Sequence, residues 1–80
     1  MFIYRMFEEV LYLDEGDPYR SYGIRVENEM GEIVEEISDI STEEHVVSEL
    51  VLRCLYGELD PVHLRDVVLN YIETAALPER

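Results

Sequence analysis

The sequence predicts an α+β domain in which a three-stranded antiparallel sheet is followed by an αα-hairpin packed on one face, in the order β-β-β-α-α. Two observations support this prediction. Residues 2–37 contain three apolar or alternating segments separated by glycine-containing turns, a pattern typical of antiparallel strands. After residue 41 the apolar residues recur every three or four positions, as on helices. A chain of 80 residues has the size of one domain, so we treat residues 1–80 as a single domain.

The first two strands are predicted over residues 2–13 and 20–27. The first segment is dense in aromatic and β-favouring residues on both faces, which favours a strand; a helix is the alternative for this segment. "DEGDPY", residues 14–19, is a turn in which Gly16 can take positive φ and Pro18 fixes the exit. The second segment alternates, with Tyr22, Ile24 and Val26 on one face. These residues predict a half-buried second strand.

The third strand is predicted over residues 32–37, after the hairpin loop "NEMG" of residues 28–31. The segment "EIVEEI" places Ile33 and Ile37 on one face, with Glu35 between them. Glu32 and Glu35 are expected to face solvent.

The first helix is predicted to start at a capping box formed by Ser41 and Glu44, which have the spacing for mutual backbone capping. Gly57 is expected to close this helix. Between them, one apolar face is predicted from Val46, Val47, Leu50, Val51, Cys54 and Leu55.

The second helix is predicted to begin at Asp60 and Pro61. An aspartate caps a helix N-terminus well, and a proline at the first helical position loses no hydrogen bond. Leu59 and Leu64 are spaced to form a hydrophobic staple. The apolar stripe that follows consists of Leu64, Val67, Val68, Tyr71 and Ile72.

The segment "GELDPVHLRDVV" also carries Asp60, His63 and Asp66, which could be metal ligands, an acid–base pair or the opening of a helix. Capping already accounts for Asp60. A metal needs three or four convergent ligands, and this helix offers two at most. The segment therefore favours the helix opening, and we expect neither a metal nor a cofactor.

Other candidate catalytic groups are also interpreted structurally. His45 and Glu49 have the spacing of a local helical pair, and Cys54 lies in the apolar stripe as a small core residue. Glu35 and Glu36 are adjacent strand residues that point to opposite faces, so they cannot form one carboxylate pair. With no phosphate loop, nucleophile elbow or CxxC pair in the sequence, we expect a protein that is not an enzyme.

The charge balance predicts the chemistry of a partner. The chain contains nineteen Asp and Glu residues but only six Arg and no Lys, which gives a net charge of -13. Such a field repels phosphate backbones and anionic membranes, so we expect no direct nucleic-acid binding, no membrane binding and a partner with a basic surface. The start "MFIYRMFEEVLYL" is interrupted by charges and resembles neither a signal peptide nor a membrane span, and the single cysteine cannot form an internal disulfide. These features predict a cytoplasmic protein.

Most of the negative charge belongs to the sheet half, where residues 1–44 hold 13 acids and 3 Arg. A docking strip for an Arg- and Lys-rich groove is predicted along the second hairpin and its exit; a solvated hairpin face is the alternative. The candidate partner-binding residues are Glu27, Glu29, Glu32, Glu35, Glu36 and Asp39.

The predicted function is a small non-enzymatic protein-binding module. Its acidic hairpin would imitate nucleic-acid phosphates and inhibit a nucleic-acid-handling protein, as a phage anti-defence or anti-CRISPR protein would. The alternative is a self-associating regulatory or structural protein, a possible homodimer, in which Phe2, Tyr4 and Tyr12 meet a second copy.

Three stretches, "SYGIRVENEMGEIVEEISDIS", "LVLRC" and "LDPVHLRDVV", carry a resemblance to known proteins. Together they resemble a family of short uncharacterised proteins, a domain of unknown function, from Gram-positive bacteria and their mobile elements. The resemblance covers approximately residues 20–72. It implies a cytosolic protein without a cofactor and supplies no catalytic residues.

Overall fold

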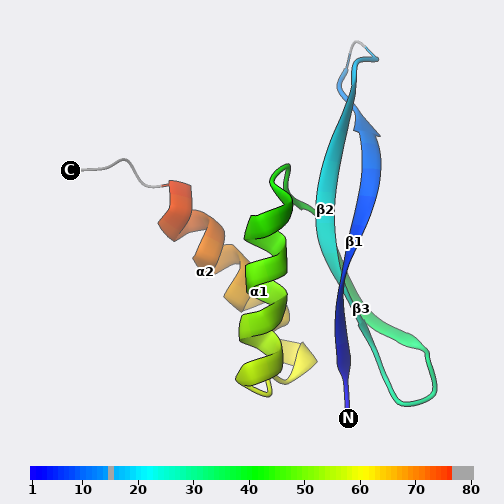
Figure 1. Ribbon diagram of the computed structural model, residues 1–80, viewed down its shortest axis with the longest axis vertical. Coiled ribbons are helices and arrows are strands. Elements are labelled where there is room, and N and C mark those ends of the chain that lie inside the picture. Colours follow the sequence, from blue (N-terminus) through cyan, green and yellow to red (C-terminus); the bar gives the residue numbers. More distant parts are fainter. Residues whose placement is uncertain (15, 77–80) are drawn as a thin grey trace.

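The structure is a computed structural model that describes residues 1–14 and 16–76. It has the predicted β-β-β-α-α order, with a short 3-10 helix leading into the last helix (Figure 1). The elements are β1 (Ile3–Tyr12), β2 (Pro18–Glu27), β3 (Ile33–Ser41), α1 (Glu44–Tyr56), η1 (Pro61–His63) and α2 (Leu64–Ala76).

The sheet is antiparallel in the order β1-β2-β3, so β2 is the central strand. Both helices lie on the same side of the sheet, and the other face is open (Figure 1). The β1–β2 hairpin extends beyond the helical layer at its tip. Tyr12 lies at that end of β1 and is exposed. The predicted packing of the helices on one face is confirmed.

The core lies between β2 and the helices. Ile24 and Val26 are completely buried, as their alternation in the sequence predicted. Burying an aliphatic side chain of this size contributes about 1.5–3 kcal/mol. The remaining buried core residues come from β1, β3 and the two helices: Tyr4, Ile40, Val47, Leu50, Val51, Cys54, Leu64 and Val68.

On the open face of the sheet, which no helix covers, side chains stack on one another. Gly23 is buried under the ring of Phe7, the residue opposite it in register. The guanidinium of Arg25 lies 4.7 Å from the centre of the same ring. A Cβ at position 23 would come within 2.3 Å of the Ile37 carbonyl oxygen and 2.7 Å of the ring, so only glycine fits there.

The third strand is longer than predicted and is irregular at two places. Between the pairs Tyr22↔Ser41 and Ile24↔Ile37, β3 contains two more residues than β2, and Asp39 takes a left-handed φ of 56°. A second register shift places Ile33 opposite Glu27. The prediction that Ile33 and Ile37 share one face is therefore wrong, because the shift moves Ile33 to the open face, where it is 53% exposed, while Ile37 packs against the core.

The predicted capping box at Ser41 and Glu44 is wrong. Ser41 is the last residue of β3, so α1 starts later, with Glu43 at the N-cap and no side-chain cap. The Ser41 hydroxyl oxygen instead accepts a hydrogen bond from the Glu43 N–H at 3.0 Å, forming a local turn between strand and helix. The predicted apolar face of this helix is largely confirmed, although Leu55 is exposed.

The end of α1 contains a left-handed residue that is not glycine. Gly57 is the C-cap, as predicted, but it has right-handed geometry, and Glu58 takes the positive φ of 52°. The Leu59 N–H donates to the Cys54 carbonyl and the Glu58 N–H to the Leu55 carbonyl. This is the Schellman pattern, in which a glycine usually follows the C-cap.

The second helix begins as predicted. The Asp60 carboxylate accepts a hydrogen bond from the Val62 N–H at 3.0 Å, and Pro61 is the first residue of η1. Leu64 is completely buried at the junction of η1 and α2. The cap therefore fixes the point from which α2 enters the core.

Replacing Glu58 with Gly should stabilise the protein by about 0.5–1 kcal/mol. Glycine removes roughly 1–2 kcal/mol of left-handed backbone strain and loses about 0.5–1 kcal/mol to chain entropy. Glu58→Ala is the matched control, because it removes the same charge and keeps the strained Cβ. Urea denaturation of both variants measures the difference. If the Gly and Ala variants were equally stable, the backbone at this position would not be strained.

Replacing Asp60 with Ala should lower the free energy of unfolding by about 0.5–2 kcal/mol, since the cap to Val62 is lost. Asp60→Asn is the control, because its side-chain oxygen can still accept the hydrogen bond. Thermal or urea denaturation should rank the asparagine variant above the alanine variant. An alanine variant as stable as the parent would show that this cap is dispensable.

Candidate functional site

The tip of the β2–β3 hairpin holds two of the predicted partner-binding residues, Glu29 and Glu32. Gly31 has the positive φ of 83° that the tight turn requires. The Asn28 side-chain oxygen accepts from the Met30 and Glu32 N–H groups, each at 2.9 Å. This side chain therefore holds the loop in one shape, with both carboxylates exposed at its surface.

Glu27 and Glu36 lie on the open face of the sheet, each beside an arginine. Arg25 Nη2 lies 2.7 Å from the Glu36 carboxylate, and Arg5 Nε lies 3.4 Å from that of Glu27. Both acids occupy register positions opposite or next to these arginines. Their charges are therefore partly balanced within the sheet.

Glu35 lies on the helix-covered face, opposite Val26 in register. Its carboxylate pairs with Arg65 of α2 at 3.3 Å, and 29% of its side chain is exposed. The expectation that Glu35 faces solvent freely is wrong, because the register of β3 turns it toward α2. Adjacent Glu36 points to the opposite face, as the strand alternation predicted.

Asp39 is part of the β3 bulge. Its two carboxylate oxygens accept hydrogen bonds from Ser21 at 2.7 Å and Tyr19 at 3.1 Å. Its N–H donates to the Glu9 carboxylate at 2.8 Å. Desolvation, followed by the Asp39 hydrogen bond, raises the pKa of the Tyr19 hydroxyl. Asp39 therefore satisfies the polar groups of the bulge and lies away from the hairpin tip.

The six predicted acids thus occupy four places: the hairpin tip, each face of the sheet and the bulge. They do not form one continuous strip. Their role in partner binding stays a prediction; at the tip, the Glu29 side chain is 74% exposed and Glu32 is exposed as well.

The arginines of the described chain are all engaged with neighbouring side chains. Arg5, Arg20, Arg25 and Arg65 each pair with a glutamate, and Arg53 lies 5.5 Å from the centre of the Tyr71 ring. The remaining carboxylates therefore outnumber the cations that could balance them. The surface field is dominated by negative charge.

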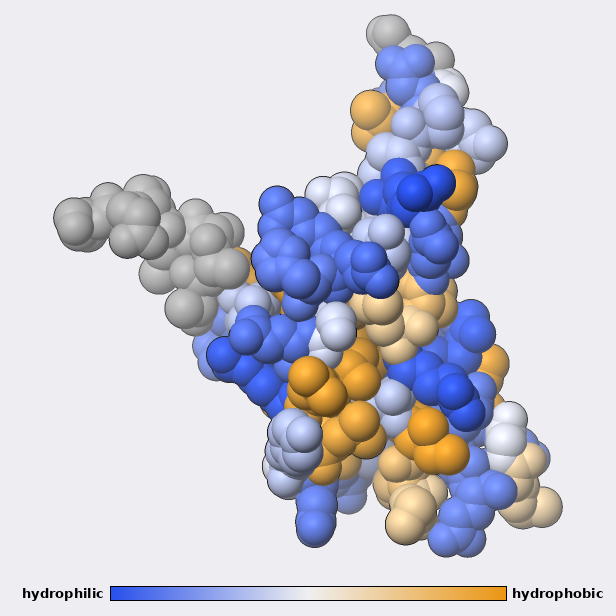
Figure 2. Space-filling model, viewed as in Figure 1, coloured by the Kyte–Doolittle hydropathy of each residue, from blue (hydrophilic) through white to orange (hydrophobic). Residues whose placement is uncertain are grey.

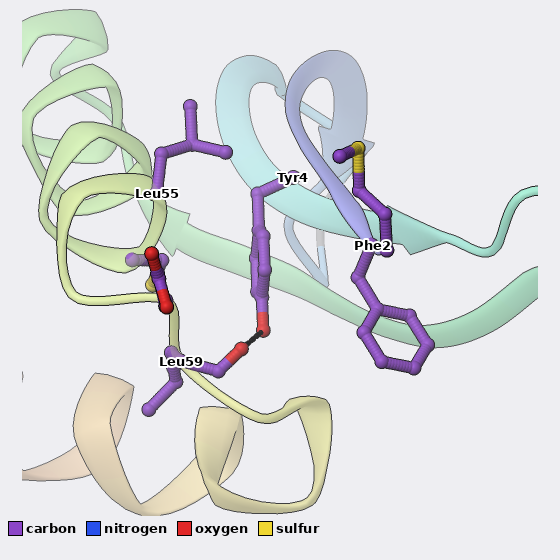
Figure 3. Close-up of a pocket in the computed structure, with 7 residues that line it drawn as sticks. Phe2, Tyr4, Leu55 and Leu59 are labelled. Atoms are coloured by element: carbon purple, nitrogen blue, oxygen red, sulfur yellow. Dashed lines mark hydrogen bonds between the residues drawn. The ribbon is translucent and has the colours of Figure 1, made fainter.

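A pocket of about 510 Å³ lies between the N-terminal end of β1 and the C-terminal end of α1 (Figure 3). Sequence reasoning missed it. The ring of Tyr4 stands between Phe2 on one side and Leu55 and Leu59 on the other. The lining residues are Met1, Phe2, Tyr4, Cys54, Leu55, Glu58 and Leu59.

The hairpin tip and the pocket lie at the same end of the molecule. The Met1 ammonium nitrogen, at the mouth of the pocket, lies 3.1 Å from the Glu29 carboxylate. Glu58 supplies a carboxylate within the pocket lining itself. An apolar hollow is therefore bordered by acids from two separate parts of the chain.

The two titratable groups inside the pocket are held in their neutral forms. The Tyr4 hydroxyl donates a hydrogen bond to the Leu59 carbonyl oxygen (Figure 3). Burial, with smaller effects from Cys54 and Asp60, raises the pKa of Tyr4 from 10.0 to about 12. Burial also raises the pKa of the Cys54 thiol. The lining is therefore neutral and apolar, apart from Glu58.

An exposed apolar stripe on α1 continues from the pocket. Leu52, Leu55 and Tyr56 lie at helical spacing on one side of the helix and are all exposed. Figure 2 shows hydrophobic surface over the lower half of α1, with further hydrophobic surface beside it at the N-terminal end of β1. The sequence signal for this surface was that Leu52 and Tyr56 are apolar but lie outside the predicted apolar face of the helix.

The predicted self-association surface is not assembled as expected. Tyr4 is only 5% exposed and cannot meet a second copy. Phe2 and Tyr12 are exposed but lie near opposite ends of β1. Any contact between copies would have to use another set of residues.

The histidines and neighbouring acids lie on the surface. His63 and Asp66 are exposed at the junction of η1 and α2, and His45 lies 3.7 Å from Glu43 rather than beside the predicted Glu49. Within residues 1–14 and 16–76, no three His, Cys, Asp or Glu side chains are grouped so that they could hold a metal. No helix in this described part is both long and apolar enough to cross a membrane.

The stability of the protein should depend on the ionisation of Tyr4. Because folding raises the pKa of this phenol, its contribution to stability is complete below pH 10.0 and is lost as the pH rises to about 12. Tyr4→Phe has no phenol to titrate at this position. Its free energy of unfolding should therefore decrease less steeply over this pH interval than that of the parent, as measured by urea denaturation.

Tyr12→Phe is the control for this titration, since Tyr12 is exposed. It should follow the pH dependence of the parent. Cys54 and Tyr19 are present in the parent and in both variants, so their ionisation affects all three proteins alike and does not change the comparison. Parallel curves for Tyr4→Phe and the parent would contradict a buried, neutral Tyr4.

Comparison with known proteins identifies a family and no characterised relative. No curated protein and no solved structure shows significant similarity to the chain. One family model matches residues 1–74, including the first strand, which lay outside the resemblance seen in the sequence. Since the match spans nearly the whole chain, the protein belongs to a family of unknown function, DUF6514.

Proposed function

We propose that this protein is a non-enzymatic binding module that uses the acidic tip of its β2–β3 hairpin to engage a protein with a basic surface. The observation that carries the proposal is the position of Glu29 and Glu32. Both are exposed on a loop whose shape is held by Asn28. A rigid, protruding acidic loop can enter a groove without first losing conformational freedom.

The charge of the whole chain supports a basic partner. The net charge is -13, and the arginines of the described chain are engaged with neighbouring side chains. A field of this sign speeds the approach of a cationic protein and repels nucleic acid. Neither tip carboxylate pairs with any of these five arginines, and Glu29 pairs with the Met1 ammonium instead.

The chemistry of the pocket supports a binding role over a catalytic one. A thiolate, and not a thiol, is the reactive form of cysteine, and burial raises the pKa of Cys54. The Tyr4 phenol is neutral at physiological pH, and its O–H donates a hydrogen bond to the Leu59 carbonyl oxygen. Neither group is prepared to act as a nucleophile or a general base.

The more specific form of the proposal is an inhibitor of a nucleic-acid-handling protein in the cytoplasm, as in a phage anti-defence or anti-CRISPR protein. Surfaces that bind nucleic acid are rich in Arg and Lys and select for closely spaced negative charge. Carboxylates on a hairpin can present such charge. The protein would then compete with nucleic acid for the same basic channel.

Reversing the charge of both tip residues, Glu29→Lys with Glu32→Lys, should slow association with the partner by about tenfold or more and flatten its dependence on salt. The partner would be captured from a lysate of the source cell with the parent protein as bait. Association rates would then be measured by surface plasmon resonance at several salt concentrations. Added nucleic acid should compete with the parent protein for the captured partner.

The matched control is Asp14→Lys with Asp17→Lys. These acids lie in the loop at the opposite end of the sheet, so the total charge change is identical and only its location differs. The control should change the association rate by about twofold at most. If both double variants slow association equally, the acidic surface acts as a whole and the tip has no special role.

A further inference from the structure

We propose that the pocket between the start of β1 and the end of α1 receives an apolar anchor side chain from a segment of the basic partner, with Arg or Lys residues of that segment beside the anchor. This inference rests on the proposed function for the partner's charge. It adds a second point of contact, which the acidic tip alone would not supply.

The walls of the pocket are suited to an apolar group. Phe2 and Leu55 are 42% and 43% exposed, so their side chains can still bury substantial area. The pocket volume of about 510 Å³ is within the range of sites that hold small ligands. Such a space admits an aromatic or long aliphatic side chain.

The inner lining offers no strong polar attachment. The Tyr4 hydroxyl already donates to Leu59, and the Cys54 thiol is buried and protonated. A polar group entering the pocket would lose water without gaining equivalent hydrogen bonds there. The pocket therefore favours apolar over polar anchors.

The border of the pocket determines the charge of the occupant. Glu58 lines it directly, and Asp60 follows two residues later. On the other side, the exposed carboxylate of Glu29 pairs with the Met1 ammonium, which lies at the pocket. Acids therefore flank the apolar hollow on two sides, and Arg or Lys beside the anchor would meet them.

The strained backbone of Glu58 agrees with this assignment. Glycine would be preferred at its positive φ of 52°, but glycine would remove the carboxylate from the pocket border. A second copy of this chain fits the border poorly, because both molecules carry a net charge of -13. A basic segment satisfies both the apolar lining and the acidic border.

A synthetic peptide provides the test. The protein contains no Trp, so the fluorescence of a single peptide Trp reports only on the peptide. The probe is an amphipathic helix of about 16 residues, roughly four turns, with one central Trp and Arg residues four positions before and after it. Binding should shift the Trp emission to shorter wavelength, as for a ring that leaves water.

Leu55→Ser should weaken binding of this peptide about tenfold, because much of one pocket wall is lost. Leu69→Ser is the matched control, since Leu69 is also an exposed helical leucine but lies outside the pocket. It should bind within about twofold of the parent. Phe2→Ala tests the opposite wall and should weaken binding to a similar extent; circular dichroism would check that each variant is folded.

The outcomes separate the pocket from the hairpin tip. If Leu55→Ser and Phe2→Ala bind as the parent does while the Glu29→Lys, Glu32→Lys variant does not, the pocket assignment is wrong and the acidic tip remains. If only the two pocket variants lose binding, the pocket is supported and the tip is not needed. No blue shift with the parent protein overturns the assignment.

Two further results would also overturn it. A peptide with Gln in place of each Arg that binds as tightly would show that the pocket does not select a basic partner. Self-association of the parent at tens of micromolar that Leu55→Ser abolishes would show that the occupant is a second copy. Sedimentation of both proteins distinguishes this last case.

Discussion

The contact between the central strand β2 and the inner face of α1 is the interaction on which the rest of the structure depends. Ile24 and Val26 are completely buried there, together with Val47 and Leu50. A chain of 80 residues can bury one such layer, so the second face of the sheet has no cover. Ion pairs and the Phe7–Arg25 stack occupy that open face instead.

The arrangement of strands and helices could be predicted from the sequence, because periodicity and turn residues are local signals. Three predicted features each have one dominant physical cause. Burial explains the alternation at Ile24 and Val26, a positive φ explains Gly31 in the hairpin loop, and N-capping explains Asp60. The start of α1 was wrong because Ser41 has two possible roles. Strand pairing with Tyr22 extends β3 to Ser41, and a capping box would have required it to leave the strand.

The candidate site was less predictable, because it depends on register and on contacts distant in sequence. The register shifts in β3 place Ile33 opposite Glu27 and Asp39 beside Ser21, and alternation along the strand gives no sign of either. Glu35 shares the face of Ile37, but its pairing with Arg65 depends on where α2 packs. The pocket joins Phe2 with Leu55, which only tertiary packing brings together. The excess of negative charge, by contrast, is visible in the composition alone.

We propose that recognition is concentrated at the end of the molecule that carries both the hairpin tip and the pocket. Titrating an isotope-labelled sample with oligo-arginine and recording amide chemical shifts tests this claim directly. We expect the largest changes in residues 28–32, with smaller ones near Met1 and Glu58. Changes spread evenly over the acidic surface, or greatest in the opposite loop at Asp14 and Asp17, would contradict it.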